Sequence, residues 1–414
     1  MTSVASVASV ASVAEIRAHF PALQRSHGGI PVAYFDGPGG TQVPRSVVEA
    51  MNGYMFHHNA NTHWRYPTSI ETDACIESAR ESVADFLGAT PAQIAFGANM
   101  TTLTFHLARA LGWRLSKGDE IVITELDHHA NIAPWRALER ERGVVIRSVP
   151  FDRETGLLNR ESLESVIGGR TRLVAIGAAS NALGTVTDVR RACEMARAVG
   201  ALSFVDAVHY APHVLVDVKA LGCDFLAYSA YKAYGPHIGV LYGRLPLFET
   251  MEIPKLDPAP DEAPERWETG TGNHEGMVGA GAAVDFMASL CDGPDRRARL
   301  ATTFAELHRR GQRLVEQLWN GLAPIDGVRL YGPPPHLPRT PTVVFTLDGC
   351  TTNEVAERLV ESGLFLSNGD FYAATVIERL GLFPDGVVRA GCACYTTEDE
   401  VLQLIDGVRW VAGR

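Results

Sequence analysis

Short apolar runs alternate with amphipathic segments along most of the chain. Between residues 94 and 206, strands are predicted by the runs IAFGA, DEIVITELD, VVIRSVPFD, TRLVAIGAASN and ALSFVD. The segments between these runs place apolar residues at helical spacing, which predicts helices between the strands. This alternation is typical of an α/β fold with a large, doubly wound, mostly parallel sheet. Because ligands gather outside the carboxyl ends of such strands, the polar residues that end these runs are the candidate site residues.

The rest of the pattern favours a second, smaller domain. After a proline-rich acidic loop and a long predicted helix over residues 298–323, strands and helices alternate again. A chain of 414 residues also exceeds one compact core of ordinary size. We therefore expect a disordered tail, a segment that packs with the small domain, a large domain and a small C-terminal α/β domain, over residues 1–13, 14–45, 46–290 and 291–414.

The amino-acid composition limits which binding partners and which cellular location we expect for the protein. The net charge of −11 disfavours nucleic acid and anionic membrane surfaces as partners. No apolar run approaches the ~20 residues that span a bilayer, and the N-terminal SVA repeat lacks the basic region of a signal peptide. The seven cysteines are dispersed and odd in number, which favours free thiols in a reducing cytoplasm. Their spacing does not predict a metal site.

One lysine lies between two apolar runs. Lys232 follows the run FLAY at 225–228 and precedes a second run at 238–242. Burial there would lower the pKa of its amine and make it a nucleophile, whereas the other three lysines lie in more polar surroundings. A buried nucleophilic lysine in an α/β chain suggests a Schiff base, most often with pyridoxal 5′-phosphate (PLP). The alternative is a lysine that extends its amine to solvent from a strand end.

Two strand ends and the turn after one of them carry groups that suit such a cofactor. Asp206 could hold a pyridinium nitrogen protonated, although aspartate is also a preferred helix cap. His209 and Asn181 could bind a phenolic oxygen, or they could serve only as turn residues. The residues alone leave both readings open for each position.

Further candidates lie on other strand ends and in the second domain. His128 and His129 follow a strand, where a histidine could stack on a ring and move protons; loop packing is the alternative. The turn with Met100 and Thr101 begins a helix, and its N–H groups and hydroxyls suit a phosphate, with a simple N-cap as the alternative. Arg389 could clamp a substrate carboxylate or form an ion pair between domains.

Ordered blocks along the chain also resemble a known family. The blocks are YFDGPGGTQVP, ELDHHANIAPW, ASNALGTV, FVDAVHYAPHVLVDVKALGCDFLAYSAYKAYGP, ETGTGNHEG and VVRAGCACYTTEDEV. From about Ala14 to the C-terminus, the sequence resembles the class V aminotransferase superfamily of fold-type I PLP-dependent enzymes. The similar branch is that of cysteine desulfurase and selenocysteine lyase-like proteins. This resemblance implies a PLP-dependent transferase fold and a small amino-acid substrate.

The resemblance implies roles for individual residues. Lys232 matches the Schiff-base lysine, Asp206 the partner of the pyridine nitrogen, and His128 the ring-stacking histidine. Thr271 resembles a threonine that reaches the phosphate of the partner subunit, which implies a homodimer with shared active sites. Other expected cofactor contacts are Asn181, His209, Ser229, Thr101, Met100 and Tyr231. The expected substrate contacts are Arg389, which matches the carboxylate-binding arginine, together with Asn181, Tyr372 and Arg65.

The chain departs from the desulfurase pattern near the expected site. Desulfurases carry a glutamine where this chain has His209 and a histidine where it has Tyr231. Their catalytic cysteine lies in a loop of the form RTGHHCA, and the corresponding stretch here is LSNGDFYAATVIERLG, residues 366–381. Tyr372 falls at the cysteine position and Ser367 at the preceding arginine.

Together with these residues, the resemblance implies an enzyme that cleaves at the β-carbon of a small L-amino acid. Lys232 would hold the cofactor as an aldimine and accept the Cα proton. An enamine would then remain after loss of a group from the β-carbon, and the resemblance implies sulfur, selenium, sulfinate or a carboxylate as that group. Transfer of sulfur to a protein persulfide is not expected, because Cys392 and Cys394 lie on a strand beyond the loop. A sulfur-acceptor protein is possible as a partner, but the sequence gives no support for one. Asp370 is expected to lie beside Tyr372 on the substrate side of the site.

Other functions stay open at this point. The same carbanion could lead to epimerisation, transamination or addition of the enamine to an aldehyde, as in decarboxylative aldol enzymes of secondary metabolism. A non-catalytic PLP-fold partner protein is disfavoured by the intact set of Lys232, Asp206 and Arg389. A nucleotide-binding oxidoreductase is disfavoured because no GxGxxG follows the first strands.

Overall fold

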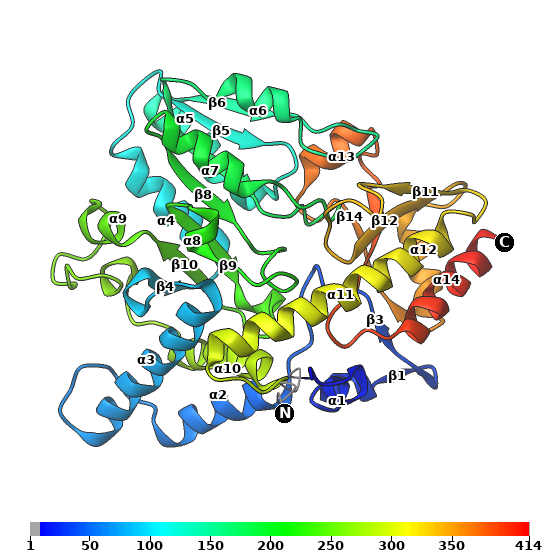
Figure 1. The fold of residues 1–414 in the computed structure, drawn as a ribbon, viewed down its shortest axis with the longest axis horizontal. Coiled ribbons are helices and arrows are strands. Elements are labelled where there is room, and N and C mark those ends of the chain that lie inside the picture. Colours follow the sequence, from blue (N-terminus) through cyan, green and yellow to red (C-terminus); the bar gives the residue numbers. More distant parts are fainter. Residues whose placement is uncertain (1–8, 414) are drawn as a thin grey trace, which may run out of the picture.

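The computed structural model describes residues 9–413, which form a large and a smaller α/β unit joined by a long helix (Figure 1). The tail expected over residues 1–13 therefore lies largely outside the described residues. Helix α1 (Val13–Ala18) begins at the end of that range, and the side chain of Ser12 caps it.

Seven strands form the large sheet, in the order β4-β10-β9-β8-β7-β5-β6. Strand β10 is antiparallel to both of its neighbours, and the other pairs are parallel. The expected doubly wound, mostly parallel sheet is confirmed, and the carboxyl ends of β5, β7, β8 and β9 share one edge. The strand bounds are β4 (Ile94–Gly97), β5 (Glu120–Thr124), β6 (Val145–Val149), β7 (Thr171–Gly177), β8 (Leu202–Asp206), β9 (Phe225–Ser229) and β10 (Gly239–Gly243).

Both faces of this sheet are buried. Along β5, Ile121 and Ile123 belong to one apolar cluster and Val122 to another. This is the pattern expected when helices cover both sides of a parallel sheet. The helices of this unit are α2 (Arg45–His57), α3 (Pro67–Leu87), α4 (Met100–Gly112), α5 (Ala133–Arg142), α6 (Arg160–Val166), α7 (Val189–Ala198), α8 (Val218–Leu221), α9 (Leu245–Thr250) and α10 (His274–Ser289).

The smaller unit contains an antiparallel sheet in the order β11-β12-β15-β14. Helix α11 (Arg296–Leu322) packs against α3 and α10 of the large unit and against α14 and β12 of the small one, so it connects the two (Figure 1). The elements of the smaller unit are β11 (Val328–Tyr331), β12 (Thr342–Leu347), α12 (Thr352–Val360), β13 (Leu364–Phe365), β14 (Ser367–Gly369), α13 (Ala374–Leu380), β15 (Val387–Gly391) and α14 (Glu398–Ala412).

The N-terminal segment runs along the smaller unit. Strand β3 (Ala33–Tyr34) pairs in parallel with β13, and the carbonyl of Phe35 accepts a hydrogen bond from Gly391 N at 2.8 Å. Before it, β1 (Ser26–His27) and β2 (Ile30–Pro31) form a small hairpin. Single 3-10 turns occur at η1 (Pro21–Gln24), η2 (Pro91–Gln93), η3 (His129–Asn131), η4 (Ala230–Lys232) and η5 (Glu265–Trp267).

Membrane-spanning helices and clusters of metal-binding side chains are both absent from residues 9–413. None of the helices within residues 9–413 is both long and apolar enough to cross a bilayer. Over the same part of the chain, no three histidine, cysteine or acidic side chains are grouped so that they could hold a metal ion.

The contact between the N-terminal segment and β15 makes a stability prediction. A Cβ at Gly391 would collide with the ring of Pro38. We expect Gly391→Ala to lower the free energy of unfolding by about 1–3 kcal/mol, because overpacking forces backbone shifts. Chemical denaturation measures this change. The matched control is Gly53→Ala in helix α2, where a Cβ meets nothing within 4 Å; it should leave stability unchanged or raise it, because alanine favours helix. Equal losses in both variants would contradict the explanation.

Candidate functional site

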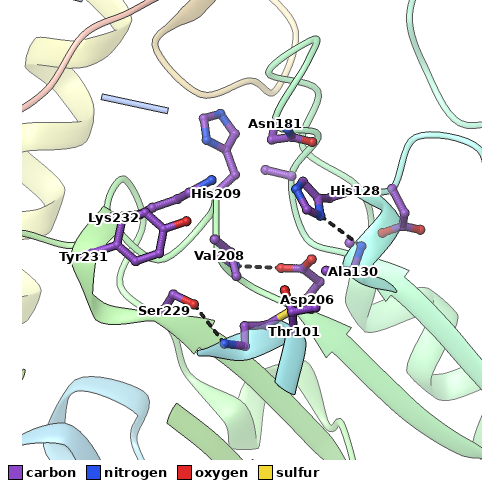
Figure 2. Close-up of a pocket in the computed structure, with 14 residues that line it drawn as sticks. Thr101, His128, Ala130, Asn181, Asp206, Val208, His209, Ser229, Tyr231 and Lys232 are labelled. Atoms are coloured by element: carbon purple, nitrogen blue, oxygen red, sulfur yellow. Dashed lines mark hydrogen bonds between the residues drawn. The ribbon is translucent and has the colours of Figure 1, made fainter. Parts of the chain in front are cut away.

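A cavity lies at the carboxyl edge of the large sheet, and its empty volume with its open mouth is about 450 Å³ (Figure 2). It is built from the ends of β5, β7, β8 and β9 and from the start of α4. Figure 2 shows Lys232 on one side of the hollow, His128 on the other and Asp206 below them. The sequence-predicted residues that line it are Met100, Thr101, His128, Asn181, Asp206, His209, Ser229, Tyr231 and Lys232.

Lys232 is buried, as the apolar runs around it predict. It ends the 3-10 turn η4 after strand β9 and is 7% exposed. Its amine makes no hydrogen bond or ion pair within residues 9–413, although the ring of Tyr231 lies 5.8 Å away. Burial lowers the pKa of the amine to about 8, the charge of Arg389 adds to this, and Asp206 opposes it. Roughly a tenth of the amine is therefore neutral and nucleophilic at pH 7, far more than for a solvated lysine.

Asp206 is the last residue of β8 and is also buried. Its Oδ1 accepts a hydrogen bond from Val208 N at 2.9 Å. Burial raises the pKa of the carboxyl to about 6, while the Val208 N–H and Lys232 lower it. The carboxyl is therefore a basic acceptor that can exchange a proton with a ligand near neutral pH.

A second carboxyl, that of Asp127, lines the cavity and is not among the site residues predicted from the sequence. Its oxygens accept hydrogen bonds from Thr124 Oγ1 at 2.6 Å and from Asn131 Nδ2 at 3.0 Å. A Cβ at Gly177, the β7 residue paired with Asp206, would overlap Oδ1 of Asp127. Burial raises the pKa of Asp127 to about 7, and the nearby Asp206 raises it further. The only feature of the sequence that could have indicated a role for Asp127 in the site is its position directly before His128.

His128 is neutral in this cavity. Its Nδ1 accepts a hydrogen bond from Ala130 N at 3.0 Å, so the ring carries its proton on Nε2. Burial lowers the pKa of His128 to about 3, helped by the charge of Lys232. The neighbouring His129 is not among the residues that line the cavity, and its Nε2 lies 3.1 Å from Oγ1 of Thr375 in α13. Of the two histidines, His128 is therefore the one placed to face a ring in the cavity.

The start of helix α4 meets the cavity where a phosphate was expected. Asn99 caps the helix by accepting from Thr102 N at 2.9 Å. Met100 N donates to Ser229 Oγ at 3.0 Å, so the N–H of Met100 is already hydrogen-bonded within the protein. The Ser229 hydroxyl hydrogen and the N–H and hydroxyl of Thr101 remain as donors at a helix N-terminus, which is a favourable place for an anion.

Asn181 and His209 line the cavity and also form hydrogen bonds with residues of the smaller unit. Asn181 Nδ2 donates to the carbonyl of Phe371 at 3.0 Å, and its buried Oδ1 has no hydrogen-bond partner within residues 9–413. His209 Nε2 lies 3.0 Å from Thr340 Oγ1 and 3.2 Å from Thr342 Oγ1. Burial holds the pKa of His209 well below its ordinary value, so its ring is neutral.

Arg389 lies on β15, next to the cavity rather than among the residues that line it. Its Nη1 donates to the carbonyl of Asn181 at 2.9 Å, and its Nε and Nη2 lie 3.3 and 3.2 Å from Ser367 Oγ. Burial lowers the pKa of the guanidinium to about 9, so it keeps its charge at neutral pH. Its carboxylate-binding role stays a prediction.

Besides Arg389, three predicted contacts lie outside the cavity. Tyr372 is 74% exposed, and its ring lies 5.7 Å from that of His128. Arg65 is exposed in the segment between α2 and α3. Thr271 is exposed and lines a separate groove with His63. Within one chain the structure does not bring Arg65 or Thr271 to Lys232, so their roles across a dimer stay predictions.

The cysteines lie apart from Lys232. All seven are in the described part of the chain, and none of them lines the Lys232 cavity. Cys392 and Cys394 line a different cavity, beside His213. Burial raises the pKa of both thiols to about 12, so they stay protonated at neutral pH.

Comparison with known proteins identifies the family. The family model Aminotransferase class-V matches residues 33–404. The chain therefore belongs to the class-V aminotransferase family, and it is a PLP-dependent enzyme with the family's α/β fold.

Similar curated proteins include cysteine desulfurases. The chain is 33% identical to the cysteine desulfurase of Synechococcus elongatus, over 95% of this chain but 63% of that longer protein. It is 32% identical to a probable cysteine desulfurase of Halalkalibacterium halodurans, over 95% of this chain and 96% of that protein.

Solved structures of cysteine desulfurases are also similar. The apo enzyme of Thermococcus onnurineus superposes with a TM-score of 0.88 at 30% identity, covering 98% of this chain and 100% of that chain. The enzyme CsdA of Escherichia coli gives 0.85 at 29% identity, covering 98% and 99% of the two chains.

The residues of the cavity fit PLP. The Lys232 amine has no hydrogen-bond partner in the described chain and can receive a carbonyl carbon. Asp206 offers a buried carboxyl for a pyridine nitrogen, and the start of α4 with Ser229 offers donors for a phosphate.

The lowered pKa of Lys232 makes a prediction about cofactor loading. When protein freed of cofactor is mixed with PLP and reduced with borohydride, the initial rate of covalent labelling should rise roughly tenfold per pH unit and level off above about pH 8. The sign follows because only the neutral amine attacks, and its fraction grows until the pH passes the pKa. Mass spectrometry of the peptide with Lys232 measures the rate, and Lys232→Ala should remove the label. A rate that still rises steeply at pH 10 would indicate an ordinary, solvated lysine.

Proposed function

We propose that this PLP-dependent enzyme cleaves a bond at the β-carbon of a small L-amino acid and releases the leaving group to solvent rather than to a protein thiol. One observation carries this proposal: the cavity combines Lys232, Asp206 and His128, while none of the seven cysteines lines it. The relatives named cysteine desulfurases support a substrate with sulfur or a similar group at the β-carbon.

The protein's own groups would act around the substrate α-carbon. PLP, when bound, supplies a carbonyl that captures the substrate amine and a ring that takes up electrons. Asp206 would hold a proton at the ring nitrogen with its carboxyl group. Lys232, once its amine is free, would take the Cα proton, because its lowered pKa leaves a neutral fraction at neutral pH.

Other residues would orient the substrate and serve the leaving group. Arg389, which keeps its charge, would bind the α-carboxylate through N–H groups that find no acceptor within residues 9–413. His128 would present its Nε2–H inside the cavity and would donate a hydrogen bond from it to a departing anion. Tyr372 lies beside His128 on the solvent side, so a leaving group would pass along its exposed ring.

We also infer a homodimer. The segment from α2 to α3 exposes large apolar side chains, which suits an interface between protein chains. These side chains are Met55, Phe56, Trp64, Tyr66 and Ile70. Arg65 belongs to the same segment, so an interface there would give it and Thr271 a route to the partner's cavity. A cytoplasmic location is part of the same proposal.

A substrate screen on the PLP-loaded protein tests the reaction. Cysteine, cysteine sulfinate, selenocysteine and aspartate are compared for release of sulfide, sulfite, selenium and CO₂, with alanine measured in each case. We expect sulfite, selenium or CO₂ together with equal alanine. Lys232→Ala should lower the rate by roughly 10²–10⁴-fold, because it removes the group that moves the Cα proton.

The buried thiols provide the matched control. Cys392→Ala and Cys394→Ala should leave product release unchanged, because both thiols lie outside the Lys232 cavity. Sulfide release that depends on either thiol would overturn release to solvent. Spectral change with no β-carbon product from any of the four substrates would overturn the proposed reaction class.

A further inference from the structure

Arg389 is a buried cation without a bonded acidic partner. It is 3% exposed, and no carboxylate forms a salt bridge with it anywhere in residues 9–413. Asp36 is near enough to favour the charged form, yet no hydrogen bond joins the two side chains. An unpaired buried guanidinium is unfavourable unless other groups stabilise it.

Neutral oxygens satisfy part of the guanidinium. The carbonyl of Asn181 binds Nη1, and the hydroxyl of Ser367 lies within hydrogen-bond distance of Nε and Nη2. A second N–H on each of Nη1 and Nη2 finds no acceptor in the described chain. These two N–H groups lie in the guanidinium plane, which is the plane in which a carboxylate binds.

An aromatic ring covers one face of the same guanidinium. The Cζ of Arg389 lies 3.8 Å from the ring centroid of Phe371, which is the distance of direct stacking. The negative face of the ring stabilises the cation without accepting any of its in-plane N–H groups. An acidic residue at this place would neutralise Arg389 and compete with a carboxylate ligand, whereas a phenylalanine does neither.

The backbone that carries Phe371 is strained. Phe371 and Tyr372 have φ values of 55° and 56°, in the left-handed region that aromatic residues rarely adopt. Such conformations are unfavourable and persist where the surrounding structure holds them. Two hydrogen bonds stabilise this turn. The carbonyl of Phe371 accepts from Asn181 Nδ2 at 3.0 Å, and the carbonyl of Tyr372 accepts from His129 N at 2.8 Å.

We propose that Phe371 is a positioning residue for substrate: its ring fixes the plane of the Arg389 guanidinium and keeps two in-plane N–H groups available for the substrate α-carboxylate. The strained turn at residues 371–372 orients the ring over the guanidinium. The hydroxyl of Ser367 contacts the edge of the guanidinium formed by Nε and Nη2. This inference rests on the proposed function in one respect, that the substrate is an α-amino acid. It does not depend on which bond breaks.

Two variants and two probes test the role of the ring. Phe371→Leu keeps an apolar side chain but removes the aromatic face, and Phe371→Tyr keeps the face. The probes are L-alanine and isopropylamine, in which a methyl group replaces the carboxylate. Binding of each probe to PLP-loaded protein is followed by the change in cofactor absorbance.

We expect Phe371→Leu to weaken L-alanine binding roughly 2- to 30-fold, the range of a lost cation–π contact, and to leave isopropylamine binding unchanged. Phe371→Tyr should bind both probes as the unaltered protein does. In the substrate screen, Phe371→Leu should raise KM with little change in kcat.

Several outcomes would overturn the inference. An equal loss for both probes would indicate general damage to the loop, and no loss for either would show that the ring does not position Arg389. Failure of the unaltered protein to prefer L-alanine would remove the carboxylate site itself. A protein that shows the expected probe pattern but releases none of the screened products would overturn the proposed reaction and leave this inference standing.

Discussion

Burial of the Lys232 amine outweighs the attraction of the nearby Asp206, so that the amine is neutral more readily than a solvated lysine. The same exclusion of water keeps the ring of His128 neutral and raises the pKa of Asp206. A cavity open to bulk water would return each group to its ordinary protonation state. The chemistry of the site therefore depends on the packing of the strand ends around it, because that packing sets how far each charge is desolvated.

The sheet explains how residues distant in sequence come to share this environment. The carboxyl ends of β5, β7, β8 and β9 lie along one edge, and this follows from the parallel pairing alone. The apolar runs predict those strands, so the clustering of Asp206 with Lys232 and His128 could be anticipated from the sequence. The large sheet, its mostly parallel pairing and the burial of Lys232 were predictable for the same reason: each reflects a local apolar pattern.

Other features depend on contacts that a local pattern does not contain. Asp127 enters the cavity because Gly177, on another strand, has no side chain in its way. His209 binds Thr340 and Thr342 of the smaller unit, and this contact depends on how the two units pack. A resemblance to a family assigns Thr271 a role in a partner's site, and a single folded chain keeps it apart from Lys232. In each case the missing information is three-dimensional and lies between elements.

The charges of the site also indicate which ligands it favours. Lys232 and Arg389 are both buried cations, and the two carboxyls nearest to the cavity, Asp127 and Asp206, are shifted by burial toward their protonated forms. The protein's own groups therefore leave positive charge that is incompletely balanced. Anions that bring their own negative charge, a phosphate at the start of α4 and a carboxylate at Arg389, would restore the balance where a neutral ligand would not. Phe371 fits this arrangement, because an aromatic face stabilises Arg389 without cancelling the charge that an anionic substrate would need.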